Sequence, residues 1–201
     1  YKSDLDFIAT LRRFAEQGNP SVMQRLGHMY ARGLGVPRDD TEAVRWYRTA
    51  SSAGNAAAMS ELAMMLFEGR GAPANSVEAL ALLRQAADSG NTNAQWRYAS
   101  VLNEGKYTTK DSAQAVVYYT RAADAGHSPA MVDLGLMHAN GNGVPRNYQE
   151  AARWYQKAIQ LNHPSAMVNM GVLYQRGNGV EKNEAEGANL YRRAVGFNQA
   201  A

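Results

Sequence analysis

The chain has 201 residues, of which 45% are hydrophobic and 19% charged, a composition that supports a folded core and excludes intrinsic disorder. Its 21 basic and 18 acidic residues give a net charge of +3, without the concentrated basic charge that is typical of nucleic-acid binders. The absence of cysteine excludes disulfides and thiolate chemistry, and no apolar run approaches the roughly 18–20 residues of a membrane-spanning helix.

The first predicted element is a single helix within residues 3–18, which we interpret as half of a repeat. Its apolar residues recur at helical spacing, so we expect Phe7, Leu11 and Phe14 to form the buried stripe. Gly18 is expected to end the helix. Because the chain opens on half a unit, we expect native sequence to precede it.

The repeated unit is clearest in the stretch Asp39–Gly54. Asp39 can cap a helix, and Glu42 can complete a capping box by reaching back to the N–H of the cap residue. Gly54 can end the helix in a left-handed conformation without a Cβ clash. The predicted apolar stripe between them is Ala43, Trp46, Tyr47 and Ala50.

This pattern returns every 36 residues, five times without an insertion, which excludes chance. The predicted caps are Asp39, Asn75, Asp111, Asn147 and Asn183. The predicted closing residues are Gly54, Gly90, Gly126, Asn162 and Asn198. The period therefore predicts one continuous solenoid: a half repeat at 1–18 followed by repeats at 19–54, 55–90, 91–126, 127–162 and 163–198.

Each unit also contains an earlier helix, which in the first repeat follows Asn19 and Pro20. Its predicted stripe includes Gly27, and a small residue there would let a neighbouring helix approach closely. Ala63, Ala99, Gly135 and Gly171 keep the equivalent positions small. Two glycines bracket the loop between the helices, except in the third repeat, where Tyr107 and the following threonines predict a different path with an exposed aromatic ring.

Several runs together resemble the Sel-one-like repeat (SLR) family, a relative of the tetratricopeptide repeat. They are Leu26-Gly27-x-x-Tyr30, Ala31-Arg-Gly-Leu-Gly-Val-Pro-Arg-Asp and Ala43-x-x-Trp46-Tyr47-x-x-Ala50, with equal matches around Gly135, Gly141 and Trp154. The resemblance covers nearly the whole chain. It implies an all-α, right-handed α-solenoid of antiparallel helix pairs. It further implies an adaptor that holds other proteins together, in an exported or periplasmic setting more than a cytoplasmic one.

The residues favour no catalytic or cofactor chemistry. The histidines at 28, 127, 138 and 163 lack the spacing of a metal site, and the Gly-x-Gly turns end helices instead of following strands as phosphate-binding loops do. No nucleophile–base pair follows from spacing. We therefore expect a non-enzymatic protein with neither metal nor cofactor, and with a protein or peptide partner instead of a nucleic acid.

The first helices also carry apolar residues outside their core stripes. By analogy with tetratricopeptide repeats, these positions would line a concave groove, and grouped apolar exposure marks binding surfaces. The candidate groove residues are Trp96, Arg97, Val132, Leu136, Val168 and Val172. Tight curvature that buries these residues against neighbouring first helices explains the same pattern, and the sequence leaves both interpretations open.

Secondary candidates are the atypical loop around Lys106 and Tyr107 and a basic row before the caps, formed by Arg38, Lys110, Arg146 and Lys182. The row is equally explained as a solvated edge. The alternative function is a structural spacer that stacks on other domains or on itself. Self-association is expected to use the last helix, whose Leu190, Val195 and Phe197 have no following repeat to cover them.

Overall fold

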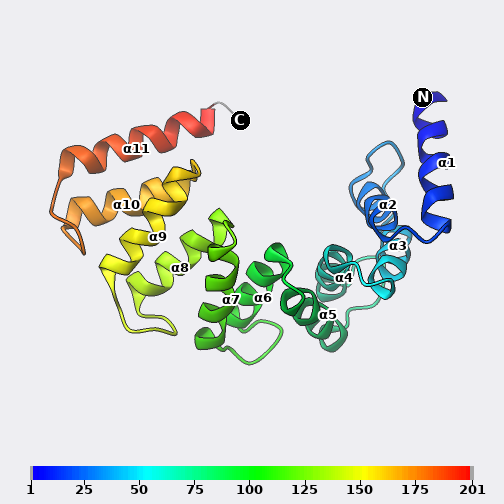
Figure 1. Cartoon of the computed structure of the whole chain (residues 1–201), viewed down its shortest axis with the longest axis horizontal. Coiled ribbons are helices and arrows are strands. Elements are labelled where there is room, and N and C mark those ends of the chain that lie inside the picture. Colours follow the sequence, from blue (N-terminus) through cyan, green and yellow to red (C-terminus); the bar gives the residue numbers. More distant parts are fainter. Residues whose placement is uncertain (1, 200–201) are drawn as a thin grey trace. The chain divides into compact units, whose positions relative to one another are not determined.

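The computed structural model describes the backbone of residues 2–199 and the side chains of residues 7–196. This part of the chain forms eleven helices and no strand (Figure 1). The helices are α1 (Lys2–Glu16), α2 (Pro20–Arg32), α3 (Asp40–Ser52), α4 (Ala56–Glu68), α5 (Ser76–Asp88), α6 (Thr92–Glu104), α7 (Ser112–Asp124), α8 (Ser128–Asn140), α9 (Tyr148–Gln160), α10 (Pro164–Arg176) and α11 (Glu184–Gln199). The predicted all-α solenoid of helix pairs is confirmed. We call α2, α4, α6, α8 and α10 the first helices of the five pairs, and their successors the second helices.

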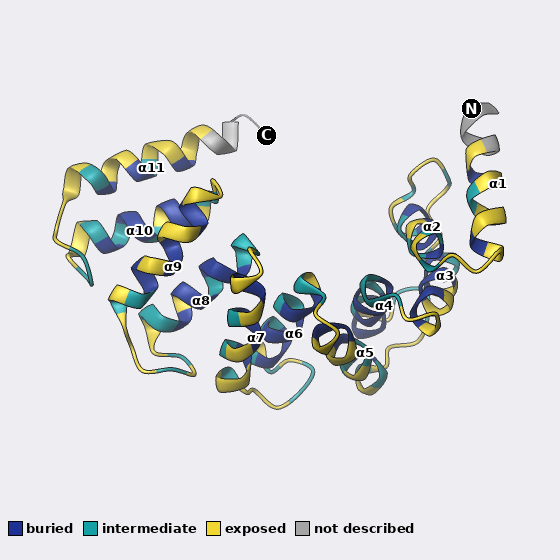
Figure 2. Ribbon diagram, in the orientation of Figure 1, coloured by how far each residue is buried: buried dark blue, intermediate teal, exposed yellow. Residues whose placement is uncertain are grey.

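The chain divides into two compact units, residues 1–98 and 99–201, with the division inside α6. In the first unit, α2 packs on α3, α3 on α4, and α4 on α5. In the second unit, α8 packs on α9, α9 on α10, and α10 on α11. Most of the helices have buried residues on one side and exposed residues on the other (Figure 2), as expected for short helices that depend on packing. The exception is α4, in which only Glu68 is exposed.

The predicted caps of the second helices are confirmed in all five repeats. Asp39 Oδ1 accepts the N–H groups of Thr41 and Glu42, each at 3.0 Å. In the later repeats the cap accepts the N–H three residues on, at Glu78, Gln114, Glu150 and Glu186. The closing residues Gly54, Gly90, Gly126 and Asn162 are left-handed as predicted, with φ of 85°, 90°, 88° and 58°. The expected end at Asn198 is wrong, because α11 continues through Gln199.

The reciprocal half of the capping box is also wrong. The N–H of Asp39 donates to the carbonyl of Tyr30 in the last turn of α2, at 3.0 Å. The same bond recurs from Asn75 to Leu66, Asp111 to Leu102, Asn147 to His138 and Asn183 to Tyr174. The last carbonyls of a helix have no hydrogen-bond partner within that helix, and the first N–H groups have none either. This one hydrogen bond therefore pairs a carbonyl at the end of the first helix with an N–H at the start of the second. Glu42 is left to pair with Arg45, at 2.8 Å.

The small residue of the first helix allows close packing, as expected. A Cβ on Gly27 would lie 2.6 Å from Cδ1 of Tyr47, a fully buried residue of α3. Gly135 and Gly171 meet Tyr155 and Tyr191 in the same way. The glycine therefore makes room for a tyrosine of the second helix.

In the second, fourth and fifth repeats, the second glycine of the loop packs against the repeat before it. A Cβ on Gly71 would overlap the carbonyl of Asp40, at the start of the preceding second helix. Gly143 approaches Ser112, and Gly179 approaches Tyr148, in the same way. In the third repeat Tyr107 occupies the equivalent position, and its side chain is half-buried, which corrects the expectation of an exposed ring.

The two terminal helices differ from expectation. In α1 the buried residues are Ile8 and Ala15, whereas Phe7 and Phe14 are 47% and 45% exposed. Both sets have helical spacing, so periodicity alone does not choose between them. In α11, Leu190 is buried, because α11 packs on α10, and Val195 is 55% exposed as expected. Phe197 lies outside the described side chains.

We predict that Gly71→Ala destabilises the chain more than Gly35→Ala does. Both glycines have φ of 72°, so an added Cβ strains the backbone equally. Only at Gly71 does it also strike the backbone of the preceding repeat; at Gly35 the nearest atom is Cε of Met29, at 3.7 Å. Overpacking costs about 1–3 kcal/mol, so the difference between the two unfolding free energies in urea should be of that size. Equal losses would show that the loop does not join the repeats.

Histidines replace asparagine as the residue before α8 and α10. His127 Nδ1 accepts the N–H of Ala130 at 3.2 Å, whereas His163 makes no such bond and its Nδ1 is buried without a partner among the described residues. Burial lowers the pKa of His127, with a smaller contribution from His163, and burial also lowers the pKa of His163. The folded chain therefore keeps both rings neutral at a pH where the unfolded chain binds protons.

We predict that stability falls on mild acidification because of these two residues. Their folded pKa values lie below the ordinary value of 6.5, so the contribution is complete above about pH 7 and is lost as the pH falls through 6.5 towards the folded pKa values. Urea midpoints at pH 8 and pH 5.5 measure it. His127→Asn with His163→Asn, which copies the caps at 19, 55 and 91, should flatten the dependence. An unchanged slope in this double variant would contradict the assignment.

Candidate protein-binding surface

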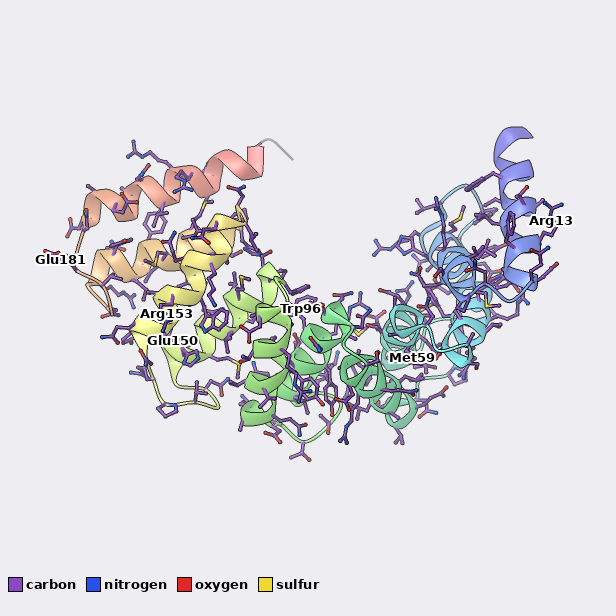
Figure 3. All side chains as sticks on the ribbon, viewed as in Figure 1. Arg13, Met59, Trp96, Glu150, Arg153 and Glu181 are labelled. Carbon is purple, nitrogen blue, oxygen red and sulfur yellow. The ribbon has the colours of Figure 1, made fainter. Side chains whose placement is uncertain are left out.

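The first two groove candidates, Trp96 and Arg97, lie on α6 in the first unit. Figure 3 labels Trp96. Trp96 is half-buried. Arg97 is also half-buried, and its guanidinium pairs with Glu61 of α4 at 2.8 Å and donates to Ser60 Oγ at 3.3 Å. These contacts hold Arg97 against the preceding first helix, beside Trp96 in the chain.

The four groove candidates of the second unit lie on α8 and α10 and differ in exposure. Leu136 and Val168 are 37% and 42% exposed, Val172 is half-buried, and Val132 is buried at 6%. Burial by neighbouring helices therefore accounts for Val132. Of the four candidates on α8 and α10, Leu136 and Val168 are therefore the two whose side chains are exposed.

Two adjoining cavities lie on this face of the second unit. The first has a volume of about 210 Å³ and is lined by α7 and α8, the last turn of α6 and the loop after α8. The second, of about 170 Å³, is lined by α8, α9, α10 and the loop after α10. Both contain Leu136 and Asn140 in their walls. They are the same site one repeat apart, since Tyr119 and Asn142 of the first correspond to Tyr155 and Asn178 of the second.

A third cavity, of about 220 Å³, continues this series beside α11. Its Tyr191 and Gln175 are the next equivalents of Tyr119 and Asn103. Three cavities at equivalent repeat positions therefore follow one another along the last three repeats.

Asparagine amides line the first two cavities. In the first, Asn103 Oδ1 accepts Ser112 Oγ–H at 3.1 Å and Asn142 Nδ2–H at 2.9 Å. The second contains Asn140, Asn169 and Asn178. Our sequence reasoning did not select these asparagines, because it looked for apolar and charged side chains and gave no weight to neutral amides. The repeated Gly-Asn-Gly of residues 141–143 and 177–179 was the available signal.

The equivalent position in the first unit is occupied by an ion-pair cluster. Arg70 occupies the repeat position of Lys106 and Asn142, which follow it by 36 and 72 residues. It pairs with Asp40 at 2.9 Å. Arg38 pairs with the same carboxylate at 2.8 Å. Hydrogen bonds from Arg38 and then Arg70 lower the pKa of Asp40 to about 2. The carboxylate is therefore charged at every pH at which the chain would act.

The secondary candidates do not form one uniform surface. In the basic row, Arg38 pairs with Asp40, and Lys182 pairs with Glu184 at 2.7 Å. Lys110 and Arg146 are exposed. In the atypical loop, the Lys106 ammonium lies 4.8 Å from the ring centre of Tyr107, a cation–π contact that covers part of the ring.

Neither a metal cluster nor a membrane-spanning helix is found in the described part of the chain. The described His, Asp and Glu side chains include no group of three placed to hold an ion. None of the described helices has the length and apolar character needed to cross a bilayer.

Comparison with solved structures identifies similar proteins. A protective antigen of uropathogenic Escherichia coli strains, c5321, which displays an SLR fold, is 30% identical with a TM-score of 0.87, over 94% of this chain and 41% of the antigen. A Sel1 repeat protein from Oxalobacter formigenes is 28% identical with a TM-score of 0.82, over 89% of this chain and 71% of that one. The immunity protein Pa5087 from Pseudomonas aeruginosa, 20% identical with a TM-score of 0.59, covers 94% and 70% and shares the fold.

The chain spans less than half the length of the Escherichia coli antigen. Comparison with curated proteins found no significant match. The Sel1 repeat model matches five consecutive segments, at residues 20–55, 56–91, 92–127, 128–163 and 164–195. Proteins built from this repeat are generally protein–protein interaction scaffolds and are typically not enzymes. With five matched repeats and the helix pairs described above, this chain belongs to the Sel1 repeat family.

Proposed function

We propose that the chain is a non-enzymatic scaffold that binds a peptide or protein segment in the concave groove that its first helices would line. The observation that carries this proposal is the exposed Leu136 of α8, which lies in the walls of two cavities lined by amides. Val168 of α10 is a second exposed apolar side chain. Recognition surfaces combine exposed apolar side chains with polar hollows. The apolar side chains gain burial on binding, and the polar groups fix the position of the bound segment.

Trp96 is the proposed anchor in the first unit. It stands in the repeat position of Gln24 and Ser60, so the fold does not demand an aromatic residue there. Its half-buried ring has apolar surface left for a partner, and the neighbouring Arg97 is already oriented by Glu61. Tryptophan and arginine are the residues most enriched among those that dominate binding energy.

The test starts from a display library of random linear peptides selected on the full chain, with affinities measured by fluorescence anisotropy. Trp96→Ala should weaken the peptides that bind the first unit by about 30-fold, because an interface anchor is worth about 2 kcal/mol. Leu136→Ser should weaken those that bind the second unit to the same extent. Leu161→Ser, which alters an exposed leucine at the end of α9, is the matched control and should leave affinity unchanged.

Circular dichroism separates binding from folding in these variants. If Trp96→Ala lowers the melting temperature and leaves affinity unchanged, Trp96 is a packing residue. If both Trp96→Ala and Leu136→Ser bind every selected peptide as tightly as the parent chain, the first-helix faces are not the binding surface, and a spacer role is favoured.

A further inference from the structure

We propose that the first cavity, between α7 and α8, binds an arginine side chain of the partner, and that Asp133 selects it. This inference rests on the proposed function, and it adds which side chain of the bound segment is recognised and by which residue. The cavity has a volume of about 210 Å³, and its wall contains Asp133, Asn140, Asn142 and the exposed Leu136.

The first step of the argument is the charge of the wall. Asp133 is half-buried, and it is the one charged side chain among the described residues that line the first cavity. A carboxylate that is partly shielded from water attracts a cation more strongly than an exposed carboxylate does, because solvent screens the pair less. A basic side chain that enters this cavity is therefore attracted, and an acidic one is repelled.

The charge of Asp133 also acts on the side chains around it. Burial raises the pKa of Tyr119 and of Tyr155, and the charge of Asp133 raises both pKa values further. Burial lowers the pKa of His163, and the charge of Asp133 opposes that fall. The negative charge of Asp133 therefore extends over this part of the second unit.

The second cavity carries the opposite charge. Asn169 occupies there the repeat position of Asp133, and Arg176 occupies the position of Asn140. Both changes make the second cavity more positive than the first, although the two are otherwise built from equivalent residues. A basic side chain therefore favours the first cavity. Because the two charges differ in sign, the bound segment cannot shift by one repeat without loss.

The first unit shows how an acid at this repeat position receives an arginine. Glu61 precedes Asp133 by two repeats, and Arg97, one repeat after Glu61, pairs with it at 2.8 Å. The same guanidinium donates to Ser60 Oγ at 3.3 Å. One repeat after Asp133 the chain has Asn169, which carries no charge. An arginine of the partner would contact Asp133 as Arg97 contacts Glu61.

The hydrogen-bonding groups of the wall favour arginine over lysine. A guanidinium has five N–H donors in a planar fork and no acceptor, so it suits a wall that offers acceptors. Asn142 donates an amide N–H to Asn103 at 2.9 Å, which leaves the carbonyl oxygen of Asn142 to accept. The cavity also exceeds the roughly 150 Å³ that accommodates a benzene-sized molecule, so the planar guanidinium group fits.

The experiment uses the full chain and the library-selected peptides whose binding Leu136→Ser weakens. We expect these peptides to share an arginine, which is then replaced by citrulline to keep the shape of the side chain and remove its charge. The parent chain should bind the citrulline peptide about tenfold more weakly, the loss expected for a hydrogen bond between charged groups. Lysine should also bind more weakly than arginine, because it keeps the charge and lacks the planar fork.

The deciding result is non-additivity between peptide and chain. Asp133→Asn should bind the arginine peptide about tenfold more weakly, and citrulline should then have little further effect. Asp124→Asn, at the exposed last residue of α7, removes the same charge and should bind both peptides as the parent chain does.

A second variant tests the cavity without altering Asp133. Asn140→Arg copies Arg176 of the second cavity and adds a positive charge to the first, so it should also weaken the arginine peptide. Circular dichroism confirms that each variant is folded.

The inference fails alone in three cases. They are Leu136-dependent peptides that share no arginine, lysine that replaces arginine without loss, and citrulline that weakens binding to Asp133→Asn as much as binding to the parent chain. In each of these the assignment of arginine to Asp133 is wrong and the scaffold function stands. If no selected peptide depends on Leu136, the inference and the second-unit surface of the proposed function fail together.

Discussion

The hydrogen bond on which each helix pair depends runs from the cap residue of the second helix to the last turn of the first. Asp39 donates its N–H to Tyr30 and accepts the next N–H groups with its side chain, so it serves both helices at once. Helices of 13 residues are marginal alone, and this shared residue fixes where one ends and the other begins. The tyrosine that packs on Gly27 and the loop glycine that packs on the preceding repeat both follow from that fixed geometry.

The sequence predicted those elements that depend on local chemistry. A cap needs a short oxygen-bearing side chain and a left-handed end needs glycine or asparagine, so Asp111 and Asn162 could be identified from residue type and period alone. The same local rules suggested that Glu42 would bond to the cap N–H. They failed because the competing acceptor, the carbonyl of Tyr30, comes close only once the pair has folded.

The candidate site was harder to predict, because it too depends on contacts that form only when the helices pack together. Apolar residues outside the core stripe could be listed, but burial by a neighbour separates Val132 from Leu136, and periodicity contains no information about that neighbour. The cavity of about 170 Å³ draws on α8, α9, α10 and the loop after α10, and only the folded pairs bring these segments together. The repeat period nevertheless explains why the cavities recur once they exist.

The two units share the same helix packing but differ in the surface at one repeat position, that of Arg70 and Asn178. An arginine at position 70 bridges to Asp40, whereas an asparagine at position 178 leaves a cavity beside Tyr155. Neither change disturbs the cap bonds, which are intact in both units. In a solenoid, where each repeat contacts mainly its neighbours, a surface can therefore change in one unit while the packing stays the same.

The most direct test of this account is the NMR spectrum of the side-chain amides, recorded on the full chain with ¹⁵N-labelled asparagine and titrated with a selected peptide whose binding Leu136→Ser weakens. The account predicts that the signals of Asn169 and Asn178 shift on binding, while those of the cap residues Asn75 and Asn147 do not. Shifts confined to the caps, or to asparagines of the first unit, would contradict it.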